Sequence, residues 1–363
     1  MRGLRPAVYN RVLFTPAKLL RMFRPATSIG CYPFRRRLCG LLPFLLCLAA
    51  VQAAWAQTAG DWCAELPRPA NAELPPGPVA DPWFQVYLAA PGVYALAEPR
   101  QFQEVISYLI LGDQRALLFD SGLGVAPIRP LVEQLTSLPV TVLNSHTHFD
   151  HVGGNAEFDT VLALDTPFTR ANMAGFPHAD LAGEVVEGAF CGPPPAGFDP
   201  EQYRTRAWQA TGFVDDGNTI DLGGRVLEVL RVPGHAPDAL ALLDRANGLL
   251  WTGDTWYDGP LWLFVPETSL QDYQASLRRL ISLTSGLRRL LPAHNTASAE
   301  PGRLTQTAAA LEKILAGRVP GQLGPDGALE FSVDGVTLVT AKPVLEGRQG
   351  ELANGGSGLT GWD

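Results

Sequence analysis

The sequence predicts an α/β fold, a sandwich of two sheets flanked by helices. Two observations predict it: short apolar runs alternate with segments of helical spacing, and the apolar runs fall into two strand-rich halves. A third concerns the site, because several runs end in a turn followed by His or Asp. The chain has 363 residues, 46% of them hydrophobic, which is enough apolar material for one large or two ordinary domains.

The first half contains the strands of one sheet, separated by helical segments. A turn at Gly112-Asp113 joins two apolar runs as a hairpin. Helices are expected at 128–136 and 167–174, where the apolar residues have helical spacing. Strands are expected at 83–88, 92–97, 105–111, 116–119, 140–144 and 161–164.

The second half repeats this pattern and ends in a hairpin. Strands are expected at 219–222, 225–231, 239–244 and 249–251, and helices at 272–283 and 301–315. Apolar and polar residues then alternate from 328 to 340 around Asp334-Gly335, which predicts a β-hairpin. We assign 82–320 to the main domain and 321–345 to a small C-terminal appendage. The Gly-rich residues 346–363 are expected to be disordered.

A cluster of possible metal ligands follows the expected strand at 140–144. It reads His146-Thr-His148-Phe-Asp150-His151, and it holds three of the six histidines of the chain. A loop at the end of a strand can turn several imidazoles and one carboxylate toward a single point. Imidazole and carboxylate suit zinc and its first-row neighbours, so the cluster predicts a metal site.

Three later segments have the same form, an apolar run followed by a turn residue and then His or Asp. Each is weak by itself, because such a residue is more often a turn or capping residue. Their order and their position after the first cluster indicate that they are ligands as well. Five of the six histidines are then candidate ligands, and His178 is expected to be a surface residue. The three further candidates are His235, Asp254 and His294.

With these motifs, the chain resembles the metallo-β-lactamase-fold superfamily of metallo-hydrolases between about residues 84 and 299. The resemblance implies a four-layer αββα sandwich of two mixed sheets. It implies that a first metal is held by His146, His148 and His235. A second metal would then be held by Asp150, His151 and His294, with Asp254 bridging the two.

Several residues near the ligands carry further expectations. The carboxylate of Asp254 resembles the glyoxalase II-like and lactonase-like branches, whereas class B1 β-lactamases have a Cys there. Tyr257 stands at the offset where lactonase-like members place a hydroxyl near the substrate; the alternative is a packed aromatic. Asp238 replaces a family Gly close to the site. Asp120 is expected to order the site from behind. Trp256, Trp262 and Phe264 are candidates for an apolar wall, although core packing is expected for at least two of them.

The predicted function is an exported hydrolase with two zinc ions, or iron or manganese, that cleaves an ester, thioester, lactone or lactam. Two bridged divalent metals lower the pKa of bound water to about 7, giving a hydroxide that attacks a carbonyl carbon. Asp150 can orient this nucleophile and take its proton. Alternatives are an iron-dependent sulfur dioxygenase with one metal, a dedicated β-lactamase, a nuclease and a non-catalytic binding protein.

The charge distribution points to export and argues against nucleic acid as a partner. Residues 1–56 hold nine of the 28 Lys and Arg residues and no acid, so residues 57–363 carry 19 bases against 36 acids, a net charge of −17. Nucleic-acid binding calls for clustered bases. Arg35-Arg-Arg37, an apolar stretch and Ala54-Trp-Ala56 form a secretory signal peptide over 1–56, with cleavage after Ala56. A retained membrane anchor is the alternative, and translation could start at Met22.

Only two cysteines follow the expected cleavage site, Cys63 and Cys191. In an oxidising compartment such a pair suggests a disulfide. It would tie the Pro-rich arm at 57–81, expected to be extended, to the irregular insertion at 177–217. The insertion is interpreted as a lid over the metal site or as a mobile surface loop. The expected partner is a small-molecule acyl substrate.

Overall fold

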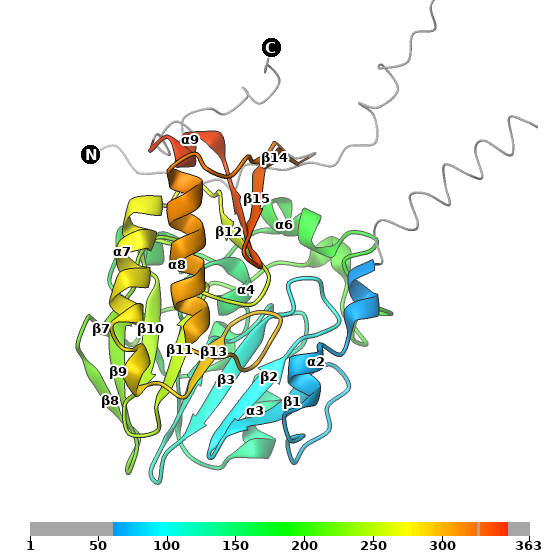
Figure 1. The fold of residues 1–363 in the computed structure, drawn as a ribbon. Coiled ribbons are helices and arrows are strands. Elements are labelled where there is room, and N and C mark those ends of the chain that lie inside the picture. Colours follow the sequence, from blue (N-terminus) through cyan, green and yellow to red (C-terminus); the bar gives the residue numbers. More distant parts are fainter. Residues whose placement is uncertain (1–60, 325–326, 348–363) are drawn as a thin grey trace, which may run out of the picture.

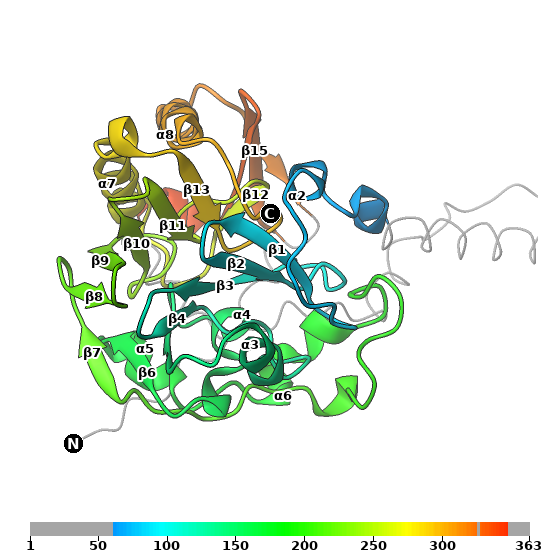
Figure 2. The same ribbon diagram turned by 90° about the horizontal axis from the view of Figure 1, so that it is seen from below.

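The computed structural model describes residues 61–324 and 327–347, and it confirms the four-layer αββα sandwich. Two sheets lie face to face, and helices cover the outer face of each one (Figure 1). Seen from below, the layers follow one another from α7 and α8, through the two sheets, to α3 and its neighbours (Figure 2). The expected signal peptide at 1–56 and nearly all of the expected tail at 346–363 lie outside the described residues.

The first sheet has seven strands among the described residues, hydrogen-bonded in chain order from β1 to β7. Pairing is antiparallel from β1 to β4 and parallel from β4 to β7. The central strands are buried on both faces, which is typical of sheets covered by other layers. The strands are β1 (Gln85–Ala90), β2 (Val93–Ala97), β3 (Ile106–Leu111), β4 (Ala116–Phe119), β5 (Val140–Leu143), β6 (Val161–Leu164) and β7 (Gly212–Val214).

The second sheet has the order β13-β11-β10-β9-β8. Because β10 is antiparallel to both β9 and β11, and β11 is parallel to β13, the strands β9, β11 and β13 all run in one direction. Their carboxyl ends therefore meet at one edge of the sheet. The strands are β8 (Thr219–Asp221), β9 (Val226–Arg231), β10 (Leu240–Asp244), β11 (Leu249–Gly253) and β13 (Arg289–Pro292).

Helix α7 (Leu270–Ile281) shows how the sequence builds the outer layers. Ser269 caps its N-terminus, since the hydroxyl accepts a hydrogen bond from the Asp272 N–H at 3.2 Å. Apolar residues at helical spacing, including Tyr273 and Leu277, are fully buried against the second sheet. The other helices are α2 (Pro69–Ala72), α3 (Arg129–Leu135), α4 (Phe149–Val152), α5 (Pro167–Asn172), α6 (His178–Leu181), α8 (Gly302–Leu315) and α9 (Lys342–Leu345).

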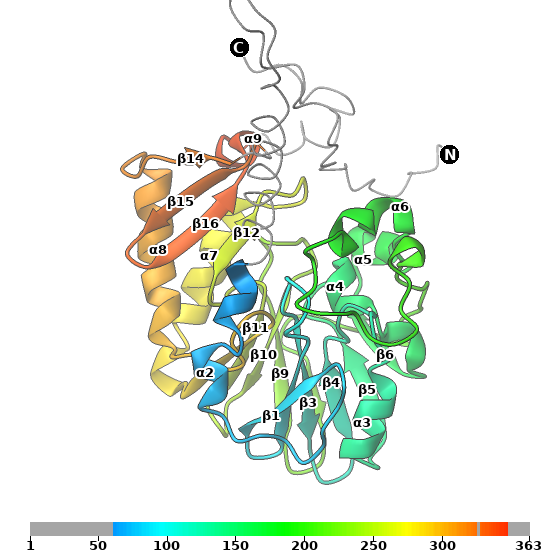
Figure 3. The ribbon, with the colours of Figure 1, turned by 90° about the vertical axis from the view of Figure 1, so that its right-hand side faces the viewer.

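The C-terminal hairpin forms as expected, but it is not a separate appendage. It pairs with the main domain, because β16 (Val336–Thr340) runs parallel to β12 (Pro260–Leu263). The resulting third sheet has the order β12-β16-β15-β14, with β15 (Leu329–Val333) and β14 (Gln322–Leu323). It lies beside α8 above the second sheet (Figure 3). The sequence analysis missed β12, whose strand pairing depends on a partner about 75 residues away in the chain.

Two further expectations are corrected by the structure. The irregular insertion ends before residue 212, because β7 is the edge strand of the first sheet. The arm is not extended over its described part, since it contains a 3₁₀ helix, Asp61–Glu65, and α2. Within the described ranges, no helix has both the length and the apolar character needed to cross a bilayer.

Candidate metal centre

All seven expected metal ligands lie together where strands of both sheets end. Strand β5 leads into the loop with His146 and His148, and the short helix α4 that follows carries Asp150 and His151. The parallel strands β9, β11 and β13 lead to the remaining ligands. The carboxyl ends of strands in the two stacked sheets therefore meet at a common edge, as the strand directions require. The ligands delivered by the second sheet are His235, Asp254 and His294.

The first group consists of His146, His148 and His235, all buried. His146 Nε2 and His235 Nε2 lie 2.8 and 3.0 Å from His148 Nδ1. The outer nitrogen of His235 donates to the Trp262 carbonyl at 2.8 Å, which leaves the lone pair on Nε2. His146 Nδ1 lies 3.1 Å from the Ser145 hydroxyl. Three imidazole nitrogens thus face one point.

The second group consists of Asp150, His151 and His294, and it mixes imidazoles with a carboxylate. Asp150 Oδ2 lies 3.4 Å from His151 Nε2 and 3.6 Å from His294 Nε2. His294 Nδ1 donates to the Gln103 carbonyl at 2.6 Å. That bond again assigns the inward-facing lone pair to Nε2.

Asp254 lies between the two groups. Its Oδ1 is 3.1 Å from His294 Nε2 and 3.5 Å from His151 Nε2, while its Oδ2 is 3.5 Å from His235 Nε2. One carboxylate therefore reaches ligands of both groups. This is the position that the resemblance assigns to a bridging ligand.

The residues fit divalent cations such as zinc. His151 Nε2 and Asp254 Oδ1 are buried and make no hydrogen bond. Buried polar atoms are almost always satisfied, so such orphaned atoms need another partner. The ligand atoms lie within 4.8 Å of one another in the first group, in the second group, and in a third set formed by His146, His151 and Asp254. A cation of the zinc type accepts imidazole nitrogen and carboxylate oxygen, and it would satisfy these atoms.

The pKa directions differ between the two groups. Burial lowers the pKa of His146 and His235, and it lowers that of His148 to about 3, so these rings are held in the neutral, ligating form. Burial also opposes protonation of His151 and His294, but the surrounding carboxylates outweigh it and raise both pKa values. The first group is therefore neutral, and the second is built around charge.

Asp120 orders the site from behind, as expected. It follows β4 with a positive φ of 64°. Its Oδ2 lies 3.1 Å from His151 Nδ1, and its Oδ1 accepts a hydrogen bond from the Ser145 N–H at 2.6 Å. One carboxylate thereby sets the ring orientation of His151 and the start of the ligand loop.

Asp238 supports the loop between the first two ligands. Its Oδ2 accepts hydrogen bonds from the hydroxyls of Thr147 at 2.6 Å and of Thr169 at 2.9 Å. Asn172 adds a bond to the Thr147 carbonyl at 2.9 Å. Since Thr147 lies between His146 and His148, these bonds fix the backbone that carries both imidazoles. The departure from the family pattern at Asp238 is thus part of this support.

Tyr257 is buried beside His294, with the ring centroids 5.0 Å apart. Its hydroxyl donates to the Pro260 carbonyl at 2.8 Å and accepts from the Trp262 N–H at 3.0 Å. The hydroxyl is therefore engaged by local backbone. This arrangement favours the packed aromatic over the catalytic hydroxyl, and the catalytic role of Tyr257 stays a prediction.

One aromatic side chain contacts the first group, and a pair of aromatic side chains lies on the segment whose backbone bonds to His235. The ring of Phe168 contacts that of His148 with centroids 5.8 Å apart, and Trp262 contacts Phe264 at 5.3 Å. Trp262 is 40% exposed, so its indole is available to a ligand. Trp256 is instead buried in the core and donates to the Thr307 hydroxyl. Of the three expected wall residues, Trp256 therefore belongs to the core.

Two acidic side chains that the sequence analysis did not assign lie near the second group. Burial, with a smaller contribution from the charge of Asp150, raises the pKa of Glu98 and of Glu184 to about 7. Glu98 accepts hydrogen bonds from the Trp83 indole and the Leu123 N–H. Glu184 accepts from the Gln103 side chain at 3.2 Å. No local motif marks either residue.

The backbone carbonyls of Gln103 and Trp262 orient two of the ligands, and no sequence signal could have identified them. Every residue has a carbonyl, so only the folded chain shows which carbonyls face a ligand. Of the other polar supports, Asp120 was visible because it closes an apolar strand, and Asp238 because it departs from the family segment.

Comparisons with known proteins agree with this site. Residues 102–294 match the family model described as the metallo-beta-lactamase superfamily. The acyl-coenzyme A thioesterase MBLAC2 of Homo sapiens is 31% identical over 208 residues, which cover 53% of this chain and 74% of the relative. The hydroxyacylglutathione hydrolase of Aeromonas hydrophila is 29% identical over 194 residues, covering 53% and 61%.

A similar fold is found in a solved structure, a metallo-beta-lactamase family protein from Thermus thermophilus. It is 25% identical, with a TM-score of 0.47, and the match covers 63% of this chain and 82% of the other.

Proposed function

The chain belongs to the metallo-beta-lactamase superfamily, and on that premise we propose that it is an exported dinuclear zinc hydrolase that cleaves an acyl thioester. The observation that carries the proposal is the convergence of seven buried ligands in two adjoining groups. The ring orientations add support, because Nδ1 of His235 and of His294 donates to a backbone carbonyl and so turns Nε2 inward.

Bound zinc would polarise the substrate carbonyl and lower the pKa of a bound water toward 7. Asp150 would orient the attacking water and accept its proton at Oδ2. Burial opposes the ionisation of Asp150, but His151 and His294 outweigh it and hold its pKa below the ordinary value. The carboxylate is therefore ionised at neutral pH and able to act as the base.

Asp150 is supported in this role by its backbone. It lies in the first turn of α4, directly after the ligand loop, and Asn144 holds the α4 backbone by donating to the His151 carbonyl at 2.6 Å. Asn144 is itself bonded to Asn155 in a buried network. A base fixed in this way keeps a constant position relative to the other ligands.

A thioester is the substrate class we favour among the acyl compounds. One relative is named a thioesterase, and the substrate in the name of the other, a hydroxyacyl group on glutathione, is carried on sulfur. The half-exposed Trp262 and the ring of Phe168 would contact an apolar acyl group beside the first metal.

Export is proposed from the N-terminal sequence and is supported by the cysteines. The basic segment, apolar stretch and Ala54-Trp-Ala56 have the form of a signal peptide. The Cys63–Cys191 disulfide fits an oxidising compartment.

The test is elemental analysis of the purified chain, followed by assays with a thioester, a lactone and a chromogenic β-lactam. We expect about two zinc per chain and the fastest cleavage of the thioester. Faster cleavage of the β-lactam would replace the substrate class. One iron per chain with none of the three cleaved would contradict the hydrolase and favour oxidative sulfur chemistry.

A further inference from the structure

The second group of ligands depends on a chain segment that the reaction does not use. Residues 98–104 connect β2 to β3 and lie against the loop that follows β13. The Gln103 carbonyl accepts the proton of His294 Nδ1 at 2.6 Å, and the Asn295 N–H donates to the Glu104 carbonyl at 3.1 Å. The Ile106 N–H donates to the Ala293 carbonyl at 2.7 Å. The position of His294 is therefore set by this segment.

Each of the two segments in this contact has one residue whose backbone φ lies in the left-handed region. Glu104 has a φ of 44° and Asn295 a φ of 64°. Asn tolerates this conformation, but for Glu it is strained. A strained backbone persists only where the surroundings hold it in place.

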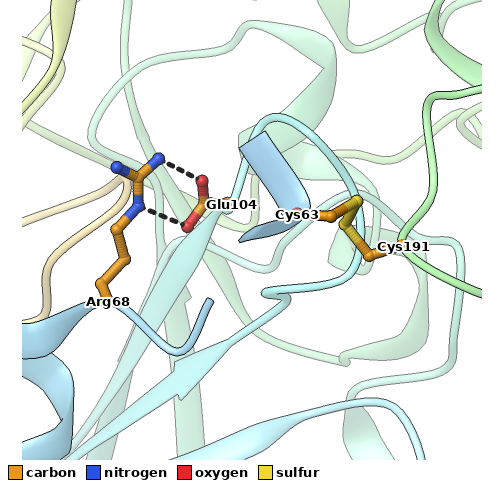
Figure 4. The surroundings of a disulfide bond; sticks show 4 residues. All are labelled: Cys63, Arg68, Glu104 and Cys191. Carbon is orange, nitrogen blue, oxygen red and sulfur yellow. Dashed lines mark hydrogen bonds and ion pairs between the residues drawn. A yellow bond between two sulfur atoms is a disulfide. The ribbon is translucent and has the colours of Figure 1, made fainter. Parts of the chain in front are cut away.

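Two side chains of the N-terminal arm hold this backbone in place through hydrogen bonds. Arg68 donates to both carboxylate oxygens of Glu104, at 3.0 and 2.5 Å, and Glu104 is 3% exposed (Figure 4). Asn71 donates to the Asn295 carbonyl at 2.8 Å and accepts from the Ala297 N–H at 2.7 Å. The arm thus bonds to the strained residue after Gln103 and to the residues that follow His294.

A disulfide joins the arm to the insertion on the other side of the same segment. Cys63 forms a disulfide with Cys191, 128 residues later in the chain (Figure 4). The Cys191 N–H donates to the Arg100 carbonyl at 2.8 Å, and the Phe102 N–H donates to the Ala189 carbonyl at 3.1 Å. The segment 98–104 therefore lies between the arm and the insertion, and the Cys63–Cys191 disulfide joins these two covalently.

We propose that Arg68 and Asn71 are positioning residues for the second metal, and that the Cys63–Cys191 disulfide keeps them in place. The inference rests on the two-metal centre of the proposed function, but it concerns residues that touch no ligand atom. No arm residue contacts the first group in the described hydrogen bonds, so the effect is specific to the second. Such outer partners typically change metal affinity 10- to 100-fold, here an order-of-magnitude expectation.

The test is a zinc titration of the metal-free full chain, followed by calorimetry. In Asn71→Ala and in Arg68→Gln we expect the affinity for zinc at the second group to fall roughly 10- to 100-fold, while the affinity at the first group stays within about threefold. The matched control is Arg225→Gln. Arg225 lies 3.3 Å from the buried Asp244 and bonds to the Leu111 carbonyl at the far end of β3, so its loss should leave both steps unchanged.

A second readout needs no metal and separates this inference from the proposed function. In the metal-free chain, the backbone N–H groups of Asn295 and Ile106 report on the contact, because they donate to the Glu104 and Ala293 carbonyls and not to the arm. We expect their hydrogen exchange to accelerate in Asn71→Ala and in Cys63→Ser, and not in the Arg225→Gln control. If the wild type takes up only one zinc, the two-metal centre fails, whereas the exchange rates still decide the role of the arm.

Unchanged amide exchange in Asn71→Ala, or zinc steps that weaken by the same factor, would show that the arm contributes only to general stability. Cys63→Ser removes the cross-link between the arm and the insertion and could fail to fold. Asn71→Ala leaves the disulfide intact, so the inference stays testable in that case.

Discussion

The two halves of the metal centre lie at one edge of the molecule but are built differently. The first consists of three imidazoles whose nitrogens lie 2.8 and 3.0 Å apart and whose pKa values burial holds low. Its loop is supported from within the domain, through Thr147 and Asp238. The second combines Asp150 with two imidazoles of raised pKa, and it depends on the segment 98–104 and on the arm.

The difference shows what each half requires of the fold. Neutral imidazoles at the end of one strand need only a fixed loop. Paired charges need every partner in place, because removing one leaves another charge buried without compensation. We therefore expect changes around the second half to affect the centre more selectively, and the following experiments test that comparison.

The largest effect is expected for Asp254, which belongs to both halves. In Asp254→Asn both groups lose their shared carboxylate, so kcat/KM for the thioester of the proposed function should fall by about 10³-fold or more, as several kcal/mol of transition-state stabilisation are lost. Zinc content should fall at the same time. The control is Asp258→Asn, whose carboxylate is half-exposed and pairs with Arg303. Full zinc content in Asp254→Asn would contradict the bridging position.

Glu98 provides a pH test of the acidic surroundings of the second half. Its pKa in the folded chain is raised to about 7 by burial, from 4.5. Its contribution to stability is therefore fully present below about pH 4.5 and is lost as the pH rises through 7, by up to about 3 kcal/mol. The amide introduced by Glu98→Gln does not titrate, so this variant should become relatively more stable between pH 5 and 8.

The measurement is urea unfolding of the metal-free chain at several pH values, for wild type and Glu98→Gln. A constant difference in the free energy of unfolding across this range would show that Glu98 ionises at its ordinary pKa. Burial raises the pKa of Glu184, the other acid near the second half, to the same value, and it also raises the pKa of Asp238 beside the first half.

Asp120 tests whether the second half can be weakened alone. In Asp120→Asn an amide can face His151 Nδ1, which moves the ring proton to Nε2 and removes the ligating lone pair. The affinity for the second zinc should fall roughly 10- to 100-fold, with the first unchanged. The reciprocal variant is Asp238→Ala, which removes the support of Thr147 and should weaken the first step instead. Equal losses at both steps in either variant would end the comparison.

The smallest effect is expected for Tyr257, which lies against His294. Because its hydroxyl bonds to the Pro260 carbonyl and the Trp262 N–H, Tyr257→Phe should cost about 1 kcal/mol of stability and less than about threefold in kcat. A loss of about 100-fold in kcat with unchanged zinc content would restore the catalytic role that the resemblance implies.

The fold and the ligands were readable from the sequence to a large degree. The strands at 116–119 and 161–164 have the expected bounds, because short buried runs flanked by turns are strong local signals. The seven candidate ligands were visible because four of them cluster directly after one apolar run and the other three each follow an apolar run and a turn. Local patterns failed for β12 and β7, which are short edge elements defined by distant partners.

The sequence by itself determined the set of candidate ligands, the sandwich of two sheets and the number of cysteines available for a disulfide. Only the tertiary structure decided that Arg68 and Asn71 contact the residues around His294, and that the Tyr257 hydroxyl faces local backbone. The physical reason is that ligand residues must carry particular chemical groups, which the sequence displays. Their support comes in part from backbone carbonyls and from contacts between segments up to 226 residues apart, and no local pattern encodes those.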